Sequence, residues 1–380
     1  MTSLSYIVYV LASLFNPITF LLYGHRDHGD QYYSSTSIEH NQSKVALFVF
    51  GDSPFEAGND QYLIPNVTVE DDEAIAWPYG MTFFHHPTGR FSDGRIVPDF
   101  IDASTAKFAN LPMLPPYLQP GPHDFTDGSN FASGGAGALA TTNTGTVASF
   151  PMQLSYFRNV TKLLQQKLGH LEAKRILRNA VYLISIGGCD YFSFYATNPN
   201  ATEPQQEEYV AIVIGNLTTV LQGIYNLGGR KIAFQNVGSL GCLPAMRQIF
   251  GVTEGCVEGL LSLANLHNTA LANVLKELES QLSGFKYSIF NYYDATEDRY
   301  LNPATYGFTN GSDGCCGTGP YRGVDCAIEP FELCEDLPEY VWFDGGHSTE
   351  RANFQYAKLI WSGTPNTTGP YNVQQLFQQV

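Results

Sequence analysis

Short apolar runs that end in glycine or in small polar residues recur along the chain. Apolar side chains dominate residues 45–50 (VALFVF), 181–186 (VYLISI), 232–237 (IAFQNV) and 286–293 (KYSIFNYY). The first run leads into GDS, the second into GGCD, the third into GSLGC and the last into Asp294. Such runs are typical of strands that are covered on both faces. We therefore expect a buried strand at each of these positions.

Longer segments with a helical pattern lie between these runs, at 152–168, 171–179, 206–227 and 257–282. Alternation of strands and helices with few hairpin signals predicts a doubly wound α/β fold, in which helices flank a parallel sheet. Right-handed crossovers bring the carboxyl ends of such strands to one edge. The sequences GDS and GGCD and the loop after residue 237 should therefore open onto the same crevice. The sequence shows neither an internal repeat nor a low-complexity linker, which predicts one domain.

Composition and charge narrow the class of protein. Of the 380 residues, 44% are apolar, which excludes disorder as a description of the whole chain. The formal net charge of −16 argues against nucleic acid as a partner and against binding to anionic membrane surfaces. Such an excess of acidic over basic residues suits a secreted or vacuolar protein.

The N-terminal segment has an export-like pattern. Residues 7–22 are mostly apolar, but the run is too short and too interrupted by polar residues for a stable membrane span. We interpret 1–24 as an imperfect signal peptide, because no Lys or Arg precedes the apolar run, and 25–44 as a variable segment. A buried N-terminal helix is the alternative. Seven N-glycosylation sequons favour export, at Asn41, Asn66, Asn159, Asn200, Asn216, Asn310 and Asn366.

The seven cysteines also favour an oxidising compartment. Cys242 and Cys256 would close a loop of 14 residues, which is worth about 3 kcal/mol in the chain-entropy model. Four more cysteines cluster downstream, at Cys315, Cys316, Cys326 and Cys334. The adjacent pair among them lacks the spacing that wraps one zinc ion, so two further disulfides are expected. Cys189 is left without a partner.

Two separated segments carry candidate nucleophilic chemistry. Ser53 stands at a sharp turn just after the first strand, where a serine can expose its hydroxyl. A helix N-cap at Asp52 or Ser53 is the alternative, and the chain has no G-x-S-x-G elbow. Asp344 precedes His347 by three residues, with two glycines between them. His347 could take a proton from a serine while Asp344 orients it, although a lone histidine is more often structural.

Several motifs in the same order resemble a known family. They are FGDS at 50–53, PTGRFSDGRIVPDFI at 87–101, GSNFASGGAGAL at 128–139, VYLISIGG at 181–188, GGRKIAFQNVGSLGCLPA from 228, CCGTG from 315 and DGGHSTE from 344. From about Val45 to Ser362 the chain resembles the GDSL, or SGNH, hydrolases, specifically the secreted plant GDSL esterase/lipases. The resemblance implies a flavodoxin-like, three-layer α/β/α hydrolase domain at 45–362, followed by a C-terminal tail at 363–380.

The resemblance also implies roles for individual residues. It makes Ser53 the nucleophile, His347 the base and Asp344 its partner, with backbone N–H groups of Ser53 and Gly135 donating to the oxyanion. It implies a small-molecule or lipid ester as substrate, no cofactor and no metal. It further implies secretion to the extracellular space, the apoplast of a plant, with a vacuolar location as the alternative.

The chain departs from the family pattern near the expected oxyanion hole. The family's third block reads Gly-X-Asn-Asp, whereas this chain has Cys189 where the asparagine would donate a hydrogen bond. A thiol is a weak donor, and loss of one oxyanion donor costs roughly 10²–10³ in kcat. Pro54 and Glu56 also replace a hydrophobic residue and an aspartate of the family pattern. A nucleophilic role for Cys189 is disfavoured because no second histidine is evident near it.

The sequence thus predicts a secreted serine hydrolase that cleaves carboxylic or acyl esters through an acyl-serine, with a weakened oxyanion hole. Two alternatives stay open. One is a catalytically impaired protein that binds an acyl ligand or acts in defence or signalling. The other is an acyltransferase that uses the same serine.

Overall fold

The computed structural model describes residues 45–63, 66–102, 109 and 111–379. The expected signal peptide, the variable segment at 25–44 and the sequon at Asn41 lie outside these residues. Among the described residues, no helix is both long and apolar enough to cross a bilayer.

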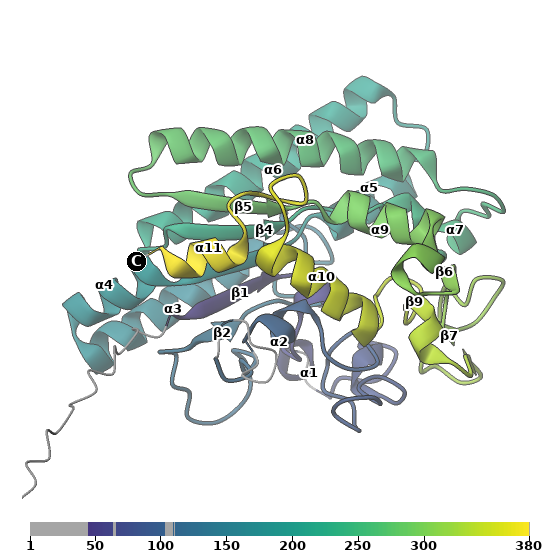
Figure 1. Cartoon of the computed structure of the whole chain (residues 1–380), viewed down its shortest axis with the longest axis horizontal. Helices are drawn as coiled ribbons and strands as arrows, with labels where there is room; N and C mark the ends of the chain where they lie inside the picture. The colour runs from purple at the N-terminus through teal and green to yellow at the C-terminus, as the bar shows by residue number, and fades with distance from the viewer. Residues whose placement is uncertain (1–44, 64–65, 103–108, 110, 380) are drawn as a thin grey trace, which may run out of the picture. The chain divides into compact units, whose positions relative to one another are not determined.

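A central sheet of parallel strands organises the domain (Figure 1). Its strands follow the order β10-β5-β4-β3-β1-β2, in which β10 is antiparallel to β5 and the other pairs are parallel. The parallel part has the 2-1-3-4-5 order of flavodoxin-like folds. The doubly wound prediction is therefore confirmed. The strand bounds are β1 Leu47–Gly51, β2 Gly128–Asn130, β3 Val181–Ser185, β4 Lys231–Gln235, β5 Lys286–Phe290 and β10 Thr368–Pro370.

Two expected strands end earlier than the apolar pattern indicates. The run at 232–237 ends as a strand at Gln235, and the run at 286–293 ends at Phe290. Asn291 stops the second strand, because its side chain accepts a hydrogen bond from the backbone N–H of Asp294 and caps the helix that follows.

The predicted helices are present, with ends displaced by a few residues. The segments expected at 152–168, 171–179, 206–227 and 257–282 form α3 Phe150–Leu168, α4 His170–Asn179, α6 Glu203–Asn226 and α8 Glu258–Gln281. Start signals explain the longer N-termini of α3 and α6. Pro151 lies in the first turn of α3, and a capping box of Thr202 and Gln205 begins α6.

The remaining helices are shorter and lie nearer the ends of the strands. They are α1 Asp60–Leu63, α2 Val97–Asp102, α5 Gly188–Thr197, α7 Pro244–Ile249, α9 Tyr292–Leu301, α10 Glu350–Ser362 and α11 Val373–Gln378. Short 3₁₀ turns occur at Ser53–Phe55, Glu73–Ile75, Leu240–Cys242, Pro303–Tyr306 and Leu337–Glu339.

Side chains that alternate along the strands divide the core into two layers. Phe48, Phe50 and Tyr182 point to the face that α3, α4, α6 and α8 cover. Leu47 and Val49 point to the opposite face, which α2, α10 and α11 cover (Figure 1). The three-layer α/β/α arrangement follows from this alternation. Residues 363–380, expected as a tail, contribute β10 and α11 to the domain, because their apolar side chains complete the second layer.

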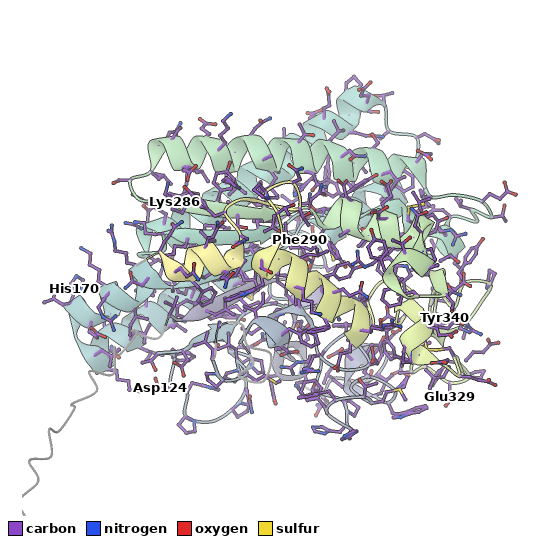
Figure 2. All side chains as sticks on the ribbon, in the orientation of Figure 1. Asp124, His170, Lys286, Phe290, Glu329 and Tyr340 are labelled. Carbon is purple, nitrogen blue, oxygen red and sulfur yellow. A yellow bond between two sulfur atoms is a disulfide. The ribbon has the colours of Figure 1, made fainter. Side chains whose placement is uncertain are left out.

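A small disulfide-bonded segment lies at one end of the domain. It pairs β6 Asn310–Gly314 with β9 Tyr340–Trp342, and β7 Cys316–Gly317 with β8 Glu332–Leu333. Figure 2 places Glu329 and Tyr340 in this segment and His170 at the other end of the domain. The disulfides join Cys315 to Cys334, Cys316 to Cys326, and, outside the segment, Cys242 to Cys256. Cys189 forms no disulfide.

Candidate active site

Ser53 lies where β1 ends, at the edge of the sheet between β1 and β3. The last residue of β1, Gly51, is held by Gln153 of α3, whose amide group hydrogen-bonds both backbone N–H and C=O of Gly51 at 2.9 and 2.7 Å. The next backbone N–H, that of Asp52, donates to Ser185 at the end of β3. Ser53 then begins a 3₁₀ turn, with Pro54 as its second residue. The turn fixes where the hydroxyl group of Ser53 points.

His347 and Asp344 meet Ser53 from the other end of the chain. Nε2 of His347 is 2.7 Å from Oγ of Ser53, and Nδ1 is 2.9 and 2.8 Å from the two carboxylate oxygens of Asp344. Oδ1 of Asp344 also accepts backbone N–H bonds from Gly346 and His347, at 2.8 and 2.7 Å. A donating Nδ1–H leaves Nε2 to accept the hydrogen bond of the serine hydroxyl. This is the geometry of a serine–histidine–aspartate triad.

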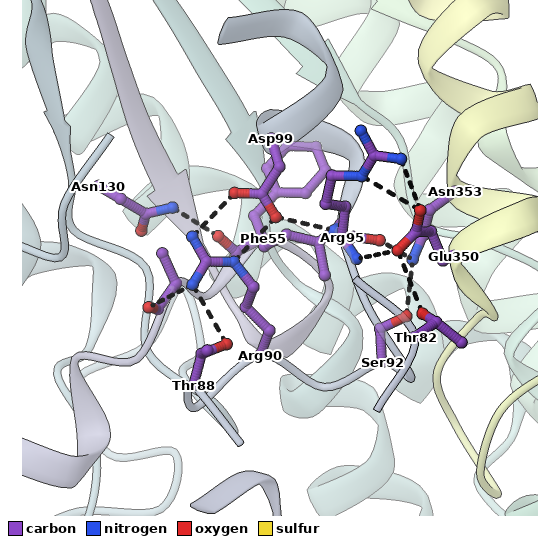
Figure 3. A network of polar contacts seen from close by, with 12 residues as sticks. Phe55, Thr82, Thr88, Arg90, Ser92, Arg95, Asp99, Asn130, Glu350 and Asn353 are labelled. Carbon is purple, nitrogen blue, oxygen red and sulfur yellow. Dashed lines mark hydrogen bonds and ion pairs between the residues drawn. The ribbon is translucent and has the colours of Figure 1, made fainter. Parts of the chain in front are cut away.

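Two sets of contacts hold the loop that carries Asp344 and His347 in place. The ring of Phe91 lies against the imidazole of His347, with centroids 4.7 Å apart. The segment that carries Phe91 is tied to α10 by the ion pair of Arg95 with Glu350 at 2.6 Å (Figure 3). Thr349 caps α10, because its side chain accepts a hydrogen bond from the backbone N–H of Ala352, so the helix begins at Glu350. A helix and a buried loop therefore support His347 from both sides.

The pKa values of the pair match a base and its orienting carboxylate. Burial alone would raise the pKa of Asp344, but the adjacent His347 and several hydrogen bonds hold it below its usual value. Burial alone would lower the pKa of His347, but Asp344 outweighs that effect and the pKa is raised. Asp344 is therefore ionised, and it stabilises the imidazolium that forms when His347 takes a proton.

A pocket of about 260 Å³ opens beside Ser53. The GDS turn, the GGCD turn and the loop after residue 237 all line it, which confirms the predicted crevice. Its apolar lining comes mainly from Phe91, Ile186, Phe192, Leu240, Leu243 and Met246. Such a mostly apolar pocket with a few convergent polar groups is typical of a small-molecule site.

Gly135 lines this pocket, as do Gly188 and Cys189 at the start of α5. Glu56 accepts a hydrogen bond from the backbone N–H of Gly134 with one oxygen and from that of Asp60 with the other. Asp190 of α5 accepts bonds from the backbone N–H groups of Ala138 and Leu139, at 2.8 and 3.2 Å. The glycine-containing loop is thus anchored from both sides. Glu56, a departure from the family pattern, has a structural role here.

Cys189 also lines the pocket, as the second residue of α5. Burial, together with the nearby carboxyl groups of Asp52 and Asp190, raises the pKa of its thiol well above the ordinary value. The group is therefore a protonated thiol at neutral pH and a poor nucleophile.

Asp52 is a second unusual group in the wall of the pocket. Its exposed fraction is 6%, and among the described residues Oδ1 finds no hydrogen-bond partner. Burial raises its pKa to about 8, so the carboxyl group is mostly protonated at neutral pH. Asp52 holds the N-cap position of the 3₁₀ turn without making a capping bond. Neither Asp52 nor Ser53 therefore acts as a side-chain helix cap.

Comparison with known proteins decides the family. The family model described as GDSL-like Lipase/Acylhydrolase matches residues 47–360. The chain belongs to this family.

Relatives within the GDSL family span most of both chains. The chain is 45% identical over 348 residues to GDSL esterase/lipase 1 of Arabidopsis thaliana, covering 89% of this chain and 91% of the relative. It is 45% identical over 341 residues to the GDSL lipase of Tanacetum cinerariifolium, covering 89% of each. It is also 38% identical over 330 residues to the inactive GDSL esterase/lipase-like protein 25 of Arabidopsis thaliana, covering 87% of this chain and 74% of the relative. One of these GDSL relatives is thus named inactive, whereas the other two are named as an esterase/lipase and a lipase.

The structure brings together every residue that the sequence singled out for the GDSL site. Ser53, His347, Gly135 and Cys189 line one pocket, and Asp344 lies directly behind His347. Sequence reasoning missed Asp190, Gln153 and the carboxyl group of Asp52. The first two act through contacts 48 to 102 residues away, which no local pattern reveals. Among the described residues, no cluster of His, Cys, Asp or Glu is arranged to hold a metal ion.

Proposed function

We propose that this GDSL-family protein hydrolyses carboxylic esters through an acyl-serine intermediate on Ser53. The observation that carries the proposal is the continuous contact from Oγ of Ser53 through His347 to Asp344. An activated serine beside an apolar pocket is the arrangement that acyl transfer requires.

The steps of the reaction follow from the hydrogen bond between the Ser53 hydroxyl and Nε2 of His347. Nε2 of His347 takes the proton of Ser53 as Oγ attacks the ester carbonyl carbon, and Asp344 stabilises the resulting imidazolium. The tetrahedral intermediate collapses, the bond to the alcohol breaks, and His347 gives its proton to the leaving oxygen. Water then repeats the sequence on the acyl-serine and releases the acid.

The oxyanion is stabilised, in this proposal, by the backbone N–H groups of Ser53 and Gly135. Cys189 stands where a third donor would act, and its thiol contributes little. We therefore infer a slow hydrolase. The presence of Cys189 in place of the family's asparagine also favours the second candidate function, in which the protein binds an acyl ligand with little turnover.

The size and lining of the pocket support a small substrate. A volume of about 260 Å³ with mostly apolar walls suits a short acyl chain or a small aromatic ester better than a long-chain lipid. Water access to the acyl-serine decides whether the acyl group passes to water or to a second alcohol. Transfer to an alcohol is thus a variant of the same mechanism.

Export and glycosylation are part of the same proposal. The asparagines at 66, 159, 200, 216 and 366 are exposed, as a glycosylated sequon requires. Asn310 is half-buried, and its side chain hydrogen-bonds Ser312 and Asp313. We expect glycans at exposed sequons and none at Asn310.

Ester turnover by the purified protein tests the function. We expect saturable release of p-nitrophenol from p-nitrophenyl butyrate and slower release from the palmitate ester. The rate should also fall as the pH falls, because His347 becomes protonated. Added methanol, with butyric acid and methyl butyrate measured by chromatography, separates hydrolysis from transfer. A protein that binds the butyrate ester but releases no p-nitrophenol would support the binding function instead.

A further inference from the structure

A second carboxyl group lies behind Asp344 and is joined to it by one phenol. The hydroxyl of Tyr79 is 2.7 Å from Oδ2 of Asp344 and 3.1 Å from Oε2 of Glu73. Tyr79 is fully buried, and its ring packs edge-on against Phe343 with centroids 5.0 Å apart. The phenol therefore has little freedom to leave either carboxyl group.

The phenol has one proton for two acceptors. Burial, followed by the charges of Asp344 and Glu73, raises the pKa of Tyr79 well above its ordinary value, so the phenol keeps this proton. When both carboxyl groups are ionised, the proton can serve only one of them fully. When Glu73 is protonated, it donates to the phenol oxygen, and the phenol donates to Asp344. Only the second arrangement satisfies all three groups.

We propose that Glu73 and Tyr79 are positioning residues that extend the triad, and that the hydrolase works with Glu73 protonated. In that form the hydrogen bonds run in one direction, from Glu73 through Tyr79 to Asp344. Asp344 then keeps a fixed orientation toward Nδ1 of His347. The inference rests on the proposed ester hydrolysis, because it concerns the same base.

The groups that face Glu73 make this protonation relevant near neutral pH. Burial is the largest influence on its carboxyl group and, with the charges of Asp344 and Asp325, raises the pKa of Glu73 to about 7. The hydrogen bond from Tyr79 and the charge of His347 act in the opposite direction. Glu73 in turn raises the pKa of His347. Loss of the proton from Glu73 therefore favours the protonated, inactive form of His347.

Glu73→Gln tests the proposal, because the amide still donates to Tyr79 but carries no charge at any pH. We expect the ratio of kcat/KM at pH 8 to that at pH 5.5 to be about three- to tenfold larger than in the wild type. Glu335→Gln removes an exposed carboxyl group from the small disulfide-bonded segment, away from Tyr79, and is the control. A structural contact alone would not change this ratio, whereas the proposed proton sharing must.

Tyr79→Phe provides the second arm, since it keeps the packed ring and removes both hydrogen bonds. We expect kcat at pH 5.5 to fall about tenfold with little change in KM. In this background Glu73→Gln should still change the pH ratio through the lost charge, but by less than it does when the phenol is present. A full effect of Glu73→Gln without the phenol would contradict the hydrogen-bonded chain.

A titration of His347 by NMR separates this inference from the proposed function. The pKa of His347 should be lower in Glu73→Gln than in the wild type, whether or not the protein turns over an ester. An unchanged pKa together with an unchanged pH ratio would overturn the inference and leave the proposed hydrolysis intact. Absence of ester turnover in the wild type would overturn the hydrolysis and leave the His347 titration to decide whether the carboxyl groups are coupled.

Discussion

Ser53→Ala is expected to lower kcat/KM for p-nitrophenyl butyrate by about 10⁴-fold or more. The hydroxyl that this change removes is the atom 2.7 Å from Nε2 of His347, and no acyl-enzyme can form without it. Removal of the nucleophile from such a triad costs about as much as removal of the whole triad. The measurement is initial-rate kinetics, with the melting temperature as a test of folding.

Ser193→Ala is the matched control for this experiment. Ser193 is an exposed serine of α5, the helix that begins at the pocket. This control should keep the wild-type rate. Turnover by Ser53→Ala at a rate close to that of the control would show that another group carries out the reaction.

The second large effect concerns Cys189. We expect Cys189→Asn to raise kcat by at least tenfold and by up to about a thousandfold, since loss of one oxyanion donor costs roughly 10²–10³ in kcat. The gain should appear in kcat with little change in KM, because the bond strengthens as charge develops on the carbonyl oxygen. Rates over a range of butyrate ester concentrations separate the two constants.

The buried carboxyl group of Asp52 adds a structural reason for this expectation. Asp52 contributes to the raised pKa of Cys189, and Oδ1 of Asp52 has no hydrogen-bond partner among the described residues. The NH₂ group of an asparagine has two hydrogens, so it can donate one hydrogen bond to Asp52 and another to the oxyanion. The variant should therefore also be at least as stable as the wild type.

Two further variants sharpen the test of Cys189. Cys189→Ser should gain less, because a hydroxyl group is shorter and cannot satisfy both partners. Ser193→Asn, which places the same amide one turn further along α5 at an exposed position, should leave kcat unchanged. A folded Cys189→Asn protein with wild-type or lower kcat would contradict the view that Cys189 replaces an oxyanion donor.

The strands and long helices were predictable because their side chains follow the period of the element. Strand β2 was not, because its sequence Gly128–Asn130 (GSN) has no apolar run and owes its place to backbone pairing with β1. For the last residues, 363–380, the sequence predicts only a tail, whereas the structure has β10 and α11 there. Thr368 and its neighbours join the sheet by pairing with β5, which no local signal reveals.

The part of the site that lies in local sequence patterns was predictable, and the part that depends on the fold was not. Ser53 and His347 stand in local patterns that signal sharp turns, although 294 residues separate them. Tyr79 and Glu73 stand in no such pattern. Tyr79 reaches Asp344 across 265 residues of sequence, so only the fold brings these groups together.

Covalent labelling of the wild-type protein tests the central claim most directly. The protein is treated with a fluorophosphonate probe at pH 7, digested and analysed by mass spectrometry. We expect one adduct on Ser53, absent in Ser53→Ala and strongly reduced in His347→Ala, where the base is missing. A folded wild-type protein that carries no adduct on Ser53, or whose adduct lies on another residue, would contradict the assignment of Ser53 as an activated nucleophile.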